Sequence, residues 1–463
     1  MAATMDSTVP VQGGISAGSL YRAVWRWHFY AGLLVLPFLA WLALTGGLYV
    51  FKDQIDGWFH ADLKHVAAAA TPVHAHGELV AAALAAVPGT LRKYSPAATA
   101  TDAAEVGITG TGGERLSVYV DPYRAQVLGQ LPEGGSVAGT IRRLHSLKYF
   151  GTVARGAIEI AAGWAILLVA TGLYLWWPRG RRGGVVSVRG KPGQRLFWRD
   201  LHAVTGVFVA AALVFLALTG MPWSVLWGQQ ANRWANGHNF GYPVGVRVQV
   251  PMSQHKLHDA GPTAWSLEQA QLPQSHDDGH AAHLGHGAAP AALAHGALDL
   301  DAAMAIAARL DLAPGYTLAL PQGPTGVYTA SVYPHDLARQ RVVHLDQYSG
   351  AVLLDMRYAD YGPLGRALEW GINVHMGQEF GPANQLLLVL ACAATVLLCA
   401  SGAAMWWKRR PAGGLGVPPL PSDRRALRTV AGLLVLGGIA FPLVGASLLV
   451  MLGLDRFLTG ASR

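Results

Sequence analysis

Five long apolar runs alternate with polar and mixed segments along the chain. A helix needs about 20 predominantly apolar residues to cross a bilayer, and each run is long enough to do so. The pattern therefore predicts an integral membrane α-helical bundle. The expected transmembrane helices are 29–51, 151–177, 203–227, 384–407 and 429–454.

The charge of the chain supports a membrane protein and gives the helices a direction. Only 13% of the 463 residues are charged, and a soluble protein has about a quarter. Basic residues gather in two short segments between apolar runs, which is typical of cytoplasmic loops. Membrane lipid is thus an expected partner, and the net charge of +8 does not require nucleic acid. The expected cytoplasmic segments are 1–28, 178–202 and 408–428, and the expected external segments are 52–150, 228–383 and 455–463.

The two long external segments are too mixed in polarity to be simple loops, and we expect two small α+β domains. Alternating residues at 116–120 and at 341–345 each precede a turn and a second short apolar run. This pattern predicts one β-hairpin in each domain. A stretch at 273–297 is rich in His, Ala and Gly, and we interpret it as a flexible insert.

The first four apolar runs carry an internal repeat. His28 and His202 precede the dipeptides Thr45-Gly46 and Thr219-Gly220 at the same spacing. A second set of positions matches at one constant offset: His145, Thr171 and Gly172 correspond to His375, Ser401 and Gly402. The predicted architecture is a tandem repeat of four core helices, with a fifth C-terminal helix outside the repeat.

The repeat places histidines at two levels of the predicted bundle. His28 is expected to face His202, and His145 to face His375. Two neutral imidazoles, one on each side, are the ligands that a six-coordinate haem iron accepts. The chain lacks a Cys-x-x-Cys-His motif, so the expected cofactor is haem b, with two haems in all. The alternatives are interfacial histidines without a ligand and packing residues inherited by duplication.

The histidines of the insert suggest a separate and weaker possibility. Imidazoles at short spacing bind transition metals loosely, although a solvated tract with incidental metal affinity is the simpler interpretation. The candidate metal ligands are His276, His280, His283 and His286, with His295 nearby.

Several motifs resemble the PepSY-associated transmembrane family, whose members are also called iron-regulated membrane proteins. The matching segments are WHFYAG at 27–32, VDPY at 120–123, DLH at 200–202 and VHMGQEFG at 374–381. The resemblance covers about residues 20–411. It implies PepSY-like external domains, two b haems, and a place in the bacterial inner membrane with the large domains in the periplasm. FoxB-like siderophore reductases belong to the same family.

The expected function is transmembrane electron transfer to a periplasmic ferric siderophore or another ferric chelate, from a cytoplasmic or quinol donor. Arg142, Arg143 and Lys148 are expected either to steer an anionic chelate, to meet haem propionates or to meet lipid headgroups. No catalytic side chain is assigned. The alternatives are a non-enzymatic PepSY regulatory protein and a permease for siderophore or haem.

Overall fold

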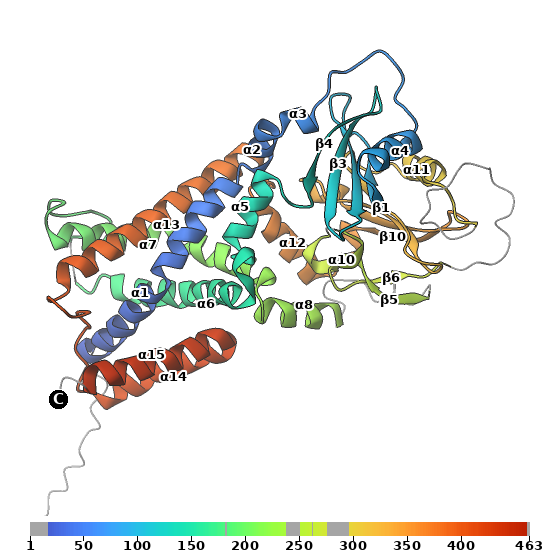
Figure 1. Ribbon diagram of the computed structural model, residues 1–463. Helices are drawn as coiled ribbons and strands as arrows, with labels where there is room; N and C mark the ends of the chain where they lie inside the picture. The colour runs from blue at the N-terminus through green and yellow to red at the C-terminus, as the bar shows by residue number, and fades with distance from the viewer. Residues whose placement is uncertain (1–16, 181–182, 238–250, 262, 276–295, 461–463) are drawn as a thin grey trace, which may run out of the picture. The chain divides into compact units, whose positions relative to one another are not determined.

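The computed structural model describes residues 17–180, 183–237, 251–261, 263–275 and 296–460 (Figure 1). The chain divides into two compact units. Unit 1 is Met1–Leu44, Val153–Leu218 and Ala391–Arg463, and unit 2 is Thr45–Thr152 and Thr219–Leu390.

Among the described residues, four helices are long and apolar enough to cross a membrane. They are α1 (Ala17–Tyr49), α6 (Gly151–Trp176), α7 (Arg195–Gly220) and α13 (Gly381–Arg409). Each contains most of one predicted transmembrane helix, because a continuous apolar run satisfies its backbone groups in lipid only by forming a helix. The protein is therefore a multi-pass membrane protein.

The prediction of one fifth transmembrane helix at 429–454 is wrong. The structure has two helices there, α14 (Arg424–Ala440) and α15 (Pro442–Gly460), separated by Phe441. Pro442 lacks a backbone N–H and disfavours helical geometry in the residue before it, so the helix ends at this point. Gly438 and Gly445 approach each other at the turn.

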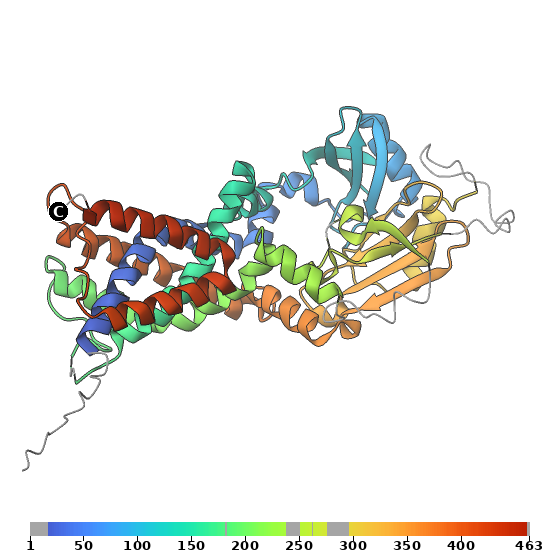
Figure 2. The same ribbon diagram turned by 90° about the horizontal axis from the view of Figure 1, so that it is seen from below.

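The two helices form a hairpin whose ends return to the same end of unit 1 (Figure 2). Near the turn, Trp164 Nε1 of α6 donates to Ser447 Oγ at 2.8 Å. Near the open end, Arg26 of α1 contacts both Asp455 and the carbonyl oxygen of Pro418. Asp455 thus lies beside residue 26, which the predicted orientation assigns to the cytoplasmic side. In that orientation Asp455 is on the cytoplasmic side, so the expected external position of 455–463 is wrong for Asp455.

Unit 2 contains one eight-stranded antiparallel sheet in the order β10-β9-β8-β7-β1-β2-β3-β4. Its strands are β1 (Gly89–Ser95), β2 (Ala104–Gly110), β3 (Arg115–Asp121), β4 (Gln126–Pro132), β7 (Thr317–Ala319), β8 (Val327–Val332), β9 (Arg341–Asp346) and β10 (Val352–Arg357). The hairpins predicted around 116–120 and 341–345 are confirmed as β3–β4 and β9–β10.

The expectation of two separate external domains is wrong in one respect, because both segments contribute to the same sheet. Strands β1 and β7 join them, pairing Lys93 with Ala319 and Tyr94 with Leu318. One hydrophobic core also serves both halves, and it includes residues of α4 (His76–Ala86) and α11 (Leu300–Arg309) together with strands from each segment. Figure 1 shows α4 and α11 next to each other at the sheet.

Two helices of unit 2 end at predicted site residues. Helix α5 (Val137–His145) ends at His145, and α12 (Pro363–His375) ends at His375. A break follows each, and the next membrane helix starts at Gly151 or Gly381, whose φ angles are +82° and +57°. Glycine adopts such angles without steric cost.

The remaining elements of unit 2 are shorter. The helices are α2 (Lys52–Phe59), α3 (Ala61–Lys64), α8 (Trp227–Gly237) and α10 (Leu257–Ala260), and a small second sheet contains β5 (Met252–Lys256) and β6 (Gln271–Pro273). The 3₁₀ turns are η1 (Lys148–Phe150), η2 (Met221–Trp223), η3 (Trp265–Leu267), η4 (Leu337–Arg339) and η5 (Tyr358–Asp360).

Candidate functional site

The structure brings His28 of α1 and His202 of α7 together in unit 1. We call them the inner pair. Their ring centroids are 6.5 Å apart and the ring planes are nearly perpendicular, at 86°. An imidazole nitrogen binds a metal ion at about 2 Å, so two rings on opposite sides of one ion have centroids about 6 Å apart. The observed spacing is compatible with two imidazoles that would hold a single metal ion between them.

Hydrogen bonds determine which nitrogen of His28 carries the proton. His28 Nδ1 lies 2.9 Å from Thr171 Oγ1. The Thr171 hydroxyl donates its own hydrogen to the carbonyl oxygen of Leu167 at 2.8 Å, so it accepts the hydrogen bond from Nδ1–H. The lone pair of the neutral ring is then on Nε2, the nitrogen that remains available to a metal.

His202 is held in the same way on the other side of the pair. Its Nδ1 lies 3.1 Å from the carbonyl oxygen of Leu398 and 3.3 Å from Ser401 Oγ. A carbonyl oxygen only accepts hydrogen bonds, so Nδ1 of His202 is the protonated nitrogen. Both rings of the inner pair therefore present Nε2 as the unprotonated nitrogen.

His145 and His375 of unit 2, the outer pair, have matching partners. His145 Nδ1 lies 2.9 Å from Thr45 Oγ1, and His375 Nδ1 lies 2.7 Å from Thr219 Oγ1. Burial, and to a smaller extent the nearby His145 imidazole, lowers the pKa of His375 to about 3. At neutral pH His375 is uncharged, which is the form that ligates metals.

A glycine follows each of the four hydroxyl residues, and the imidazole lies against it. A Cβ at Gly46 or Gly172 would lie 3.2 or 3.3 Å from Cε1 of the neighbouring histidine. At Gly220 and Gly402 the corresponding distances are 3.5 and 3.4 Å. We call each Thr-Gly or Ser-Gly dipeptide with its ring a histidine clamp.

The clamps are the feature of the candidate site that the sequence did not predict. The dipeptides were visible as landmarks of the repeat, but nothing in the spacing paired Thr45 with His145 or Thr171 with His28. Helices α1 and α7 each carry one ring of the inner pair. Further along, each also carries the Thr-Gly dipeptide that contacts one ring of the outer pair. The spacing from ring to hydroxyl is identical on the two helices, because the repeat preserves it.

The other predicted site residues divide into two groups. His276, His280, His283, His286 and His295 lie outside the described residues. Within the described part, no group of three or more His, Cys, Asp or Glu side chains is arranged to hold a metal ion. The basic residues near His145 are placed on α5 and η1, where Arg142 and Lys148 are exposed and Arg143 is half-buried. Arg143 stacks over Tyr149 at 5.8 Å and donates to the Glu133 carbonyl oxygen.

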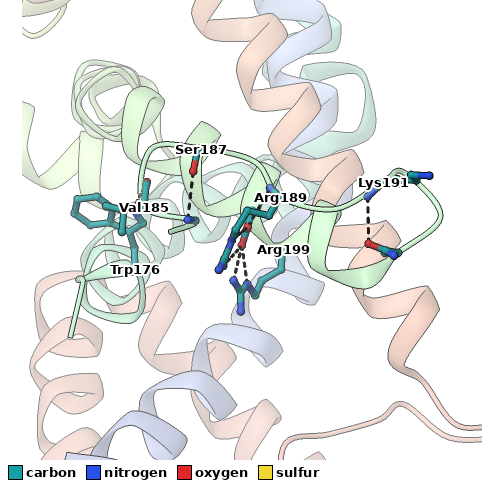
Figure 3. Close-up of polar contacts among 9 residues, drawn as sticks. Trp176, Val185, Ser187, Arg189, Lys191 and Arg199 are labelled. Atoms are coloured by element: carbon teal, nitrogen blue, oxygen red, sulfur yellow. Dashed lines mark hydrogen bonds and ion pairs between the residues drawn. The ribbon is translucent and has the colours of Figure 1, made fainter. Parts of the chain in front are cut away.

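A buried carboxylate lies two residues before His202. Asp200 is fully buried and accepts hydrogen bonds from Arg189 Nε at 2.8 Å and Arg199 Nε at 2.9 Å. Figure 3 shows both arginines pointing to this carboxylate. Arg189 therefore fixes the basic segment before α7 to the beginning of that helix, and Arg199, on the helix itself, supplies a second cation.

The sequence matches the family model described as the PepSY-associated TM region over residues 25–409. The matched segment contains both histidine pairs and all four clamps. It ends at the last residue of α13, so the hairpin α14–α15 lies outside it. No curated protein matches the chain. By its match over most of its length, the chain belongs to the family of the PepSY-associated TM region.

Proposed function

We propose that the protein is a haem-containing membrane reductase that passes electrons across the membrane to an external ferric chelate such as a ferric siderophore. The single observation that carries the proposal is the inner pair, whose neutral rings lie 6.5 Å apart with both Nδ1 atoms hydrogen-bonded. Ionisable side chains within a membrane bundle cost free energy, and such residues usually have a function. A redox cofactor gives these rings one.

His28 and His202 would ligate the inner b haem, and His145 and His375 the outer one. When bound, haem supplies reversible one-electron redox chemistry. The chain's own residues orient the four rings, and in the inner pair Thr171, Ser401 and the Leu398 carbonyl oxygen keep Nδ1 protonated and increase the basicity of Nε2. The clamp glycines leave room for each ring against the backbone of the helix that carries the glycine.

The proposed acceptor site is near the outer pair. Arg142, Arg143 and Lys148 form no ion pair with a carboxylate in the described part of the chain. Cations without a carboxylate partner attract an anionic ferric chelate and increase its rate of encounter. Reduction weakens the chelate, because hard oxygen ligands prefer Fe(III) to Fe(II). In this proposal the sheet of unit 2 is periplasmic and the membrane is the bacterial inner membrane.

Reduced-minus-oxidised spectra of the purified full-length protein test the cofactor. We expect a low-spin b-type spectrum and two haems per chain in a haem-replete host. Replacing His28 or His202 with Ala should remove one haem, and replacing His145 or His375 should remove the other. His74→Ala is the control, because His74 is half-buried at a site remote in sequence from the four ligands and its ring pairs with Glu78. A protein without haem would contradict the proposal.

A second experiment separates the reductase from a regulator or a permease. The dithionite-reduced protein is mixed anaerobically with a ferric siderophore, and haem reoxidation is followed by stopped flow. We expect one haem oxidised per Fe(III) reduced, with the reoxidation lost in His145→Ala. Haem that stays reduced in the presence of every ferric chelate would contradict electron transfer.

A further inference from the structure

An open groove of about 450 Å³ lies in unit 1 beside the clamp of His202. Its wall on α13 begins at Ala403, directly after Ser401-Gly402, which hold the His202 ring. The lining residues are Pro192, Trp198, Ala403, Ala404, Trp406, Trp407 and Lys408. The volume is within the range of about 300–1,000 Å³ that is usual for small-molecule sites.

Comparison with the first half of the repeat explains why the groove exists. At the constant offset between the two halves, Leu173 and Tyr174 of α6 correspond to Ala403 and Ala404 of α13, whereas both tryptophans are retained. The two alanines therefore leave open the space that a leucine and a tyrosine occupy at the equivalent positions of α6. The second half thus has two small side chains at positions where the first half has two large ones.

Local hydrogen bonds keep the walls of the groove in place. Trp198 Nε1 donates to the Pro192 carbonyl oxygen at 2.7 Å, and Lys408 Nζ donates to the Gly193 carbonyl oxygen at 3.0 Å. The turn that carries Pro192 is closed by Gln194, whose Oε1 accepts from the Lys191 backbone N–H (Figure 3). The groove is thus a formed site before any ligand arrives.

The chemistry of the lining selects a flat, apolar ligand with polar oxygen atoms at its edge. The indoles of Trp198 and Trp406 offer stacking faces, Arg410 covers one face of the Trp407 indole at 3.7 Å, and the alanines add no bulk. The Lys408 ammonium has two further N–H donors for an oxygen of the ligand. The groove also lies at the end of a membrane helix, where tryptophan marks the interface between lipid and water. A lipid-soluble quinol has these properties.

We propose that this groove binds a membrane quinol, the electron donor of the reductase. The inference rests on the proposed function. A bound quinol gives up two electrons one at a time and releases two protons to the aqueous side, leaving quinone. The two electrons leave through the inner pair and reduce two Fe(III) chelates to Fe(II), so charge and atoms balance. The basic residues after Lys408 also suit a soluble acidic electron donor. The experiment tests this alternative with a soluble reduced flavin.

Refilling the groove with the residues of the first half tests the site. The double variant Ala403→Leu/Ala404→Tyr introduces side chains that the equivalent helix already accommodates. In haem-loaded protein in lipid nanodiscs, decylubiquinol should reduce the haems of the variant at least tenfold more slowly than those of the wild type. Dithionite should reduce both equally. Ala400→Leu is the matched control, because Ala400 is exposed on the same helix outside the groove.

The outcomes separate the two proposals. Haem that dithionite reduces but decylubiquinol does not, or equal quinol rates in wild type and double variant, overturn the quinol site and leave the reductase intact. Reduction by a soluble reduced flavin alone also overturns it. A protein without haem contradicts the proposed reductase function. In that case photolabelling with an azidoquinone still tests whether the groove binds a quinol. Label on 403–408 that decylubiquinone displaces supports the site, and label elsewhere overturns it.

Discussion

The two halves of the repeat carry opposite charges at the same position. Two residues before its inner histidine, the first half has Arg26 and the second half has Asp200, and both side chains are buried. Arg26 is neutralised by Asp455 of the C-terminal hairpin, and Asp200 by Arg189 and Arg199 of the basic segment. In the first half the counter-ion comes from outside the repeated helices, and in the second half it comes from the start of α7 and the segment before it.

The difference between the two sites is how well the partners are shielded from water. The side chains of Arg26 and Asp455 are 3% and 14% exposed, whereas Arg189 and Arg199 are both 42% exposed. A buried charge that loses its ionic partner stays out of contact with water, and this lowers the stability of the fold. A surface cation that loses its partner can turn to solvent, so the loss of stability is smaller. The comparison shows that either charge is accommodated at this position when a segment packed against it supplies the counter-ion.

Removing the counter-ion of Arg26 should have the largest effect. Asp455→Ala leaves Arg26 buried without this carboxylate and removes an acceptor from Tyr30, so we expect a loss of about 3–5 kcal/mol in stability. The hairpin should detach, which thermal unfolding in detergent and proteolysis at 411–423 would detect. The exposed Arg428→Ala is the control. The double variant Arg26→Met/Asp455→Leu should recover most of the loss; a double variant as unstable as Asp455→Ala would contradict the ion-pair explanation.

The corresponding change in the second half should cost less. Asp200→Asn removes the charge but keeps an oxygen, and both arginines have access to water. We expect a loss of about 1.5–3 kcal/mol, the range for hydrogen bonds to a charged group. The same thermal measurement ranks the two sites. A greater loss for Asp200→Asn than for Asp455→Ala would reverse the comparison.

The sequence predicted those parts of the molecule that depend on local pattern. Apolar length predicted α1, α6, α7 and α13, and the repeat placed His28 opposite His202 because parallel duplication puts equivalent residues at one level. Strand alternation and turn residues predicted β3–β4 and β9–β10. In each case the signal lies within one element or one repeat.

The failures concern contacts between distant residues. The pairing of β1 with β7 joins strands from the two different external segments, and no local signal identifies which edges of two sheets will meet. Pro442 alone did not predict a hairpin, since membrane helices often tolerate a proline. Predicting the clamps requires knowing which helices pack against each other. A repeat of equivalent helices does not give that information.

The histidine clamps give a smaller difference between the halves. His28 Nδ1 has Thr171 as its acceptor among the described residues, whereas His202 Nδ1 has both Ser401 and the Leu398 carbonyl oxygen. Thr171→Val should therefore weaken haem retention about tenfold, and Ser401→Ala by less than about threefold because the carbonyl remains. Transfer of haem to a scavenging protein measures both rates of loss. Equal effects would show that the carbonyl oxygen does not support His202.

The helices that end at the outer pair should respond to pH with opposite signs. Asp56 accepts a hydrogen bond from the Ala138 backbone N–H at 2.9 Å, at the beginning of α5. Burial opposes its ionisation, but this bond and Lys64 keep the pKa of Asp56 below its usual value. Glu369 of α12 is buried and accepts from Ser266, and burial raises the pKa of Glu369.

The two directions have defined consequences. A lowered pKa stabilises the fold above the unfolded value of about 4, and that contribution is lost as the pH falls through the folded pKa. A raised pKa stabilises it below the unfolded value, and that contribution is lost as the pH rises through the folded pKa. Acidification should therefore loosen α5 and tighten α12.

Hydrogen exchange of 137–145 and 363–375, corrected for intrinsic rates, measures this contrast between pH 7 and about pH 2, a range that extends below the unfolded pKa of Asp56. Asp56→Asn should cost about 1 kcal/mol at pH 7, as for loss of a helix cap, and remove the acid sensitivity of α5. Glu369→Gln should remove the pH response of α12 and leave α5 unchanged. If both helices lose protection together on acidification, a shared event controls them and the carboxylates do not act separately.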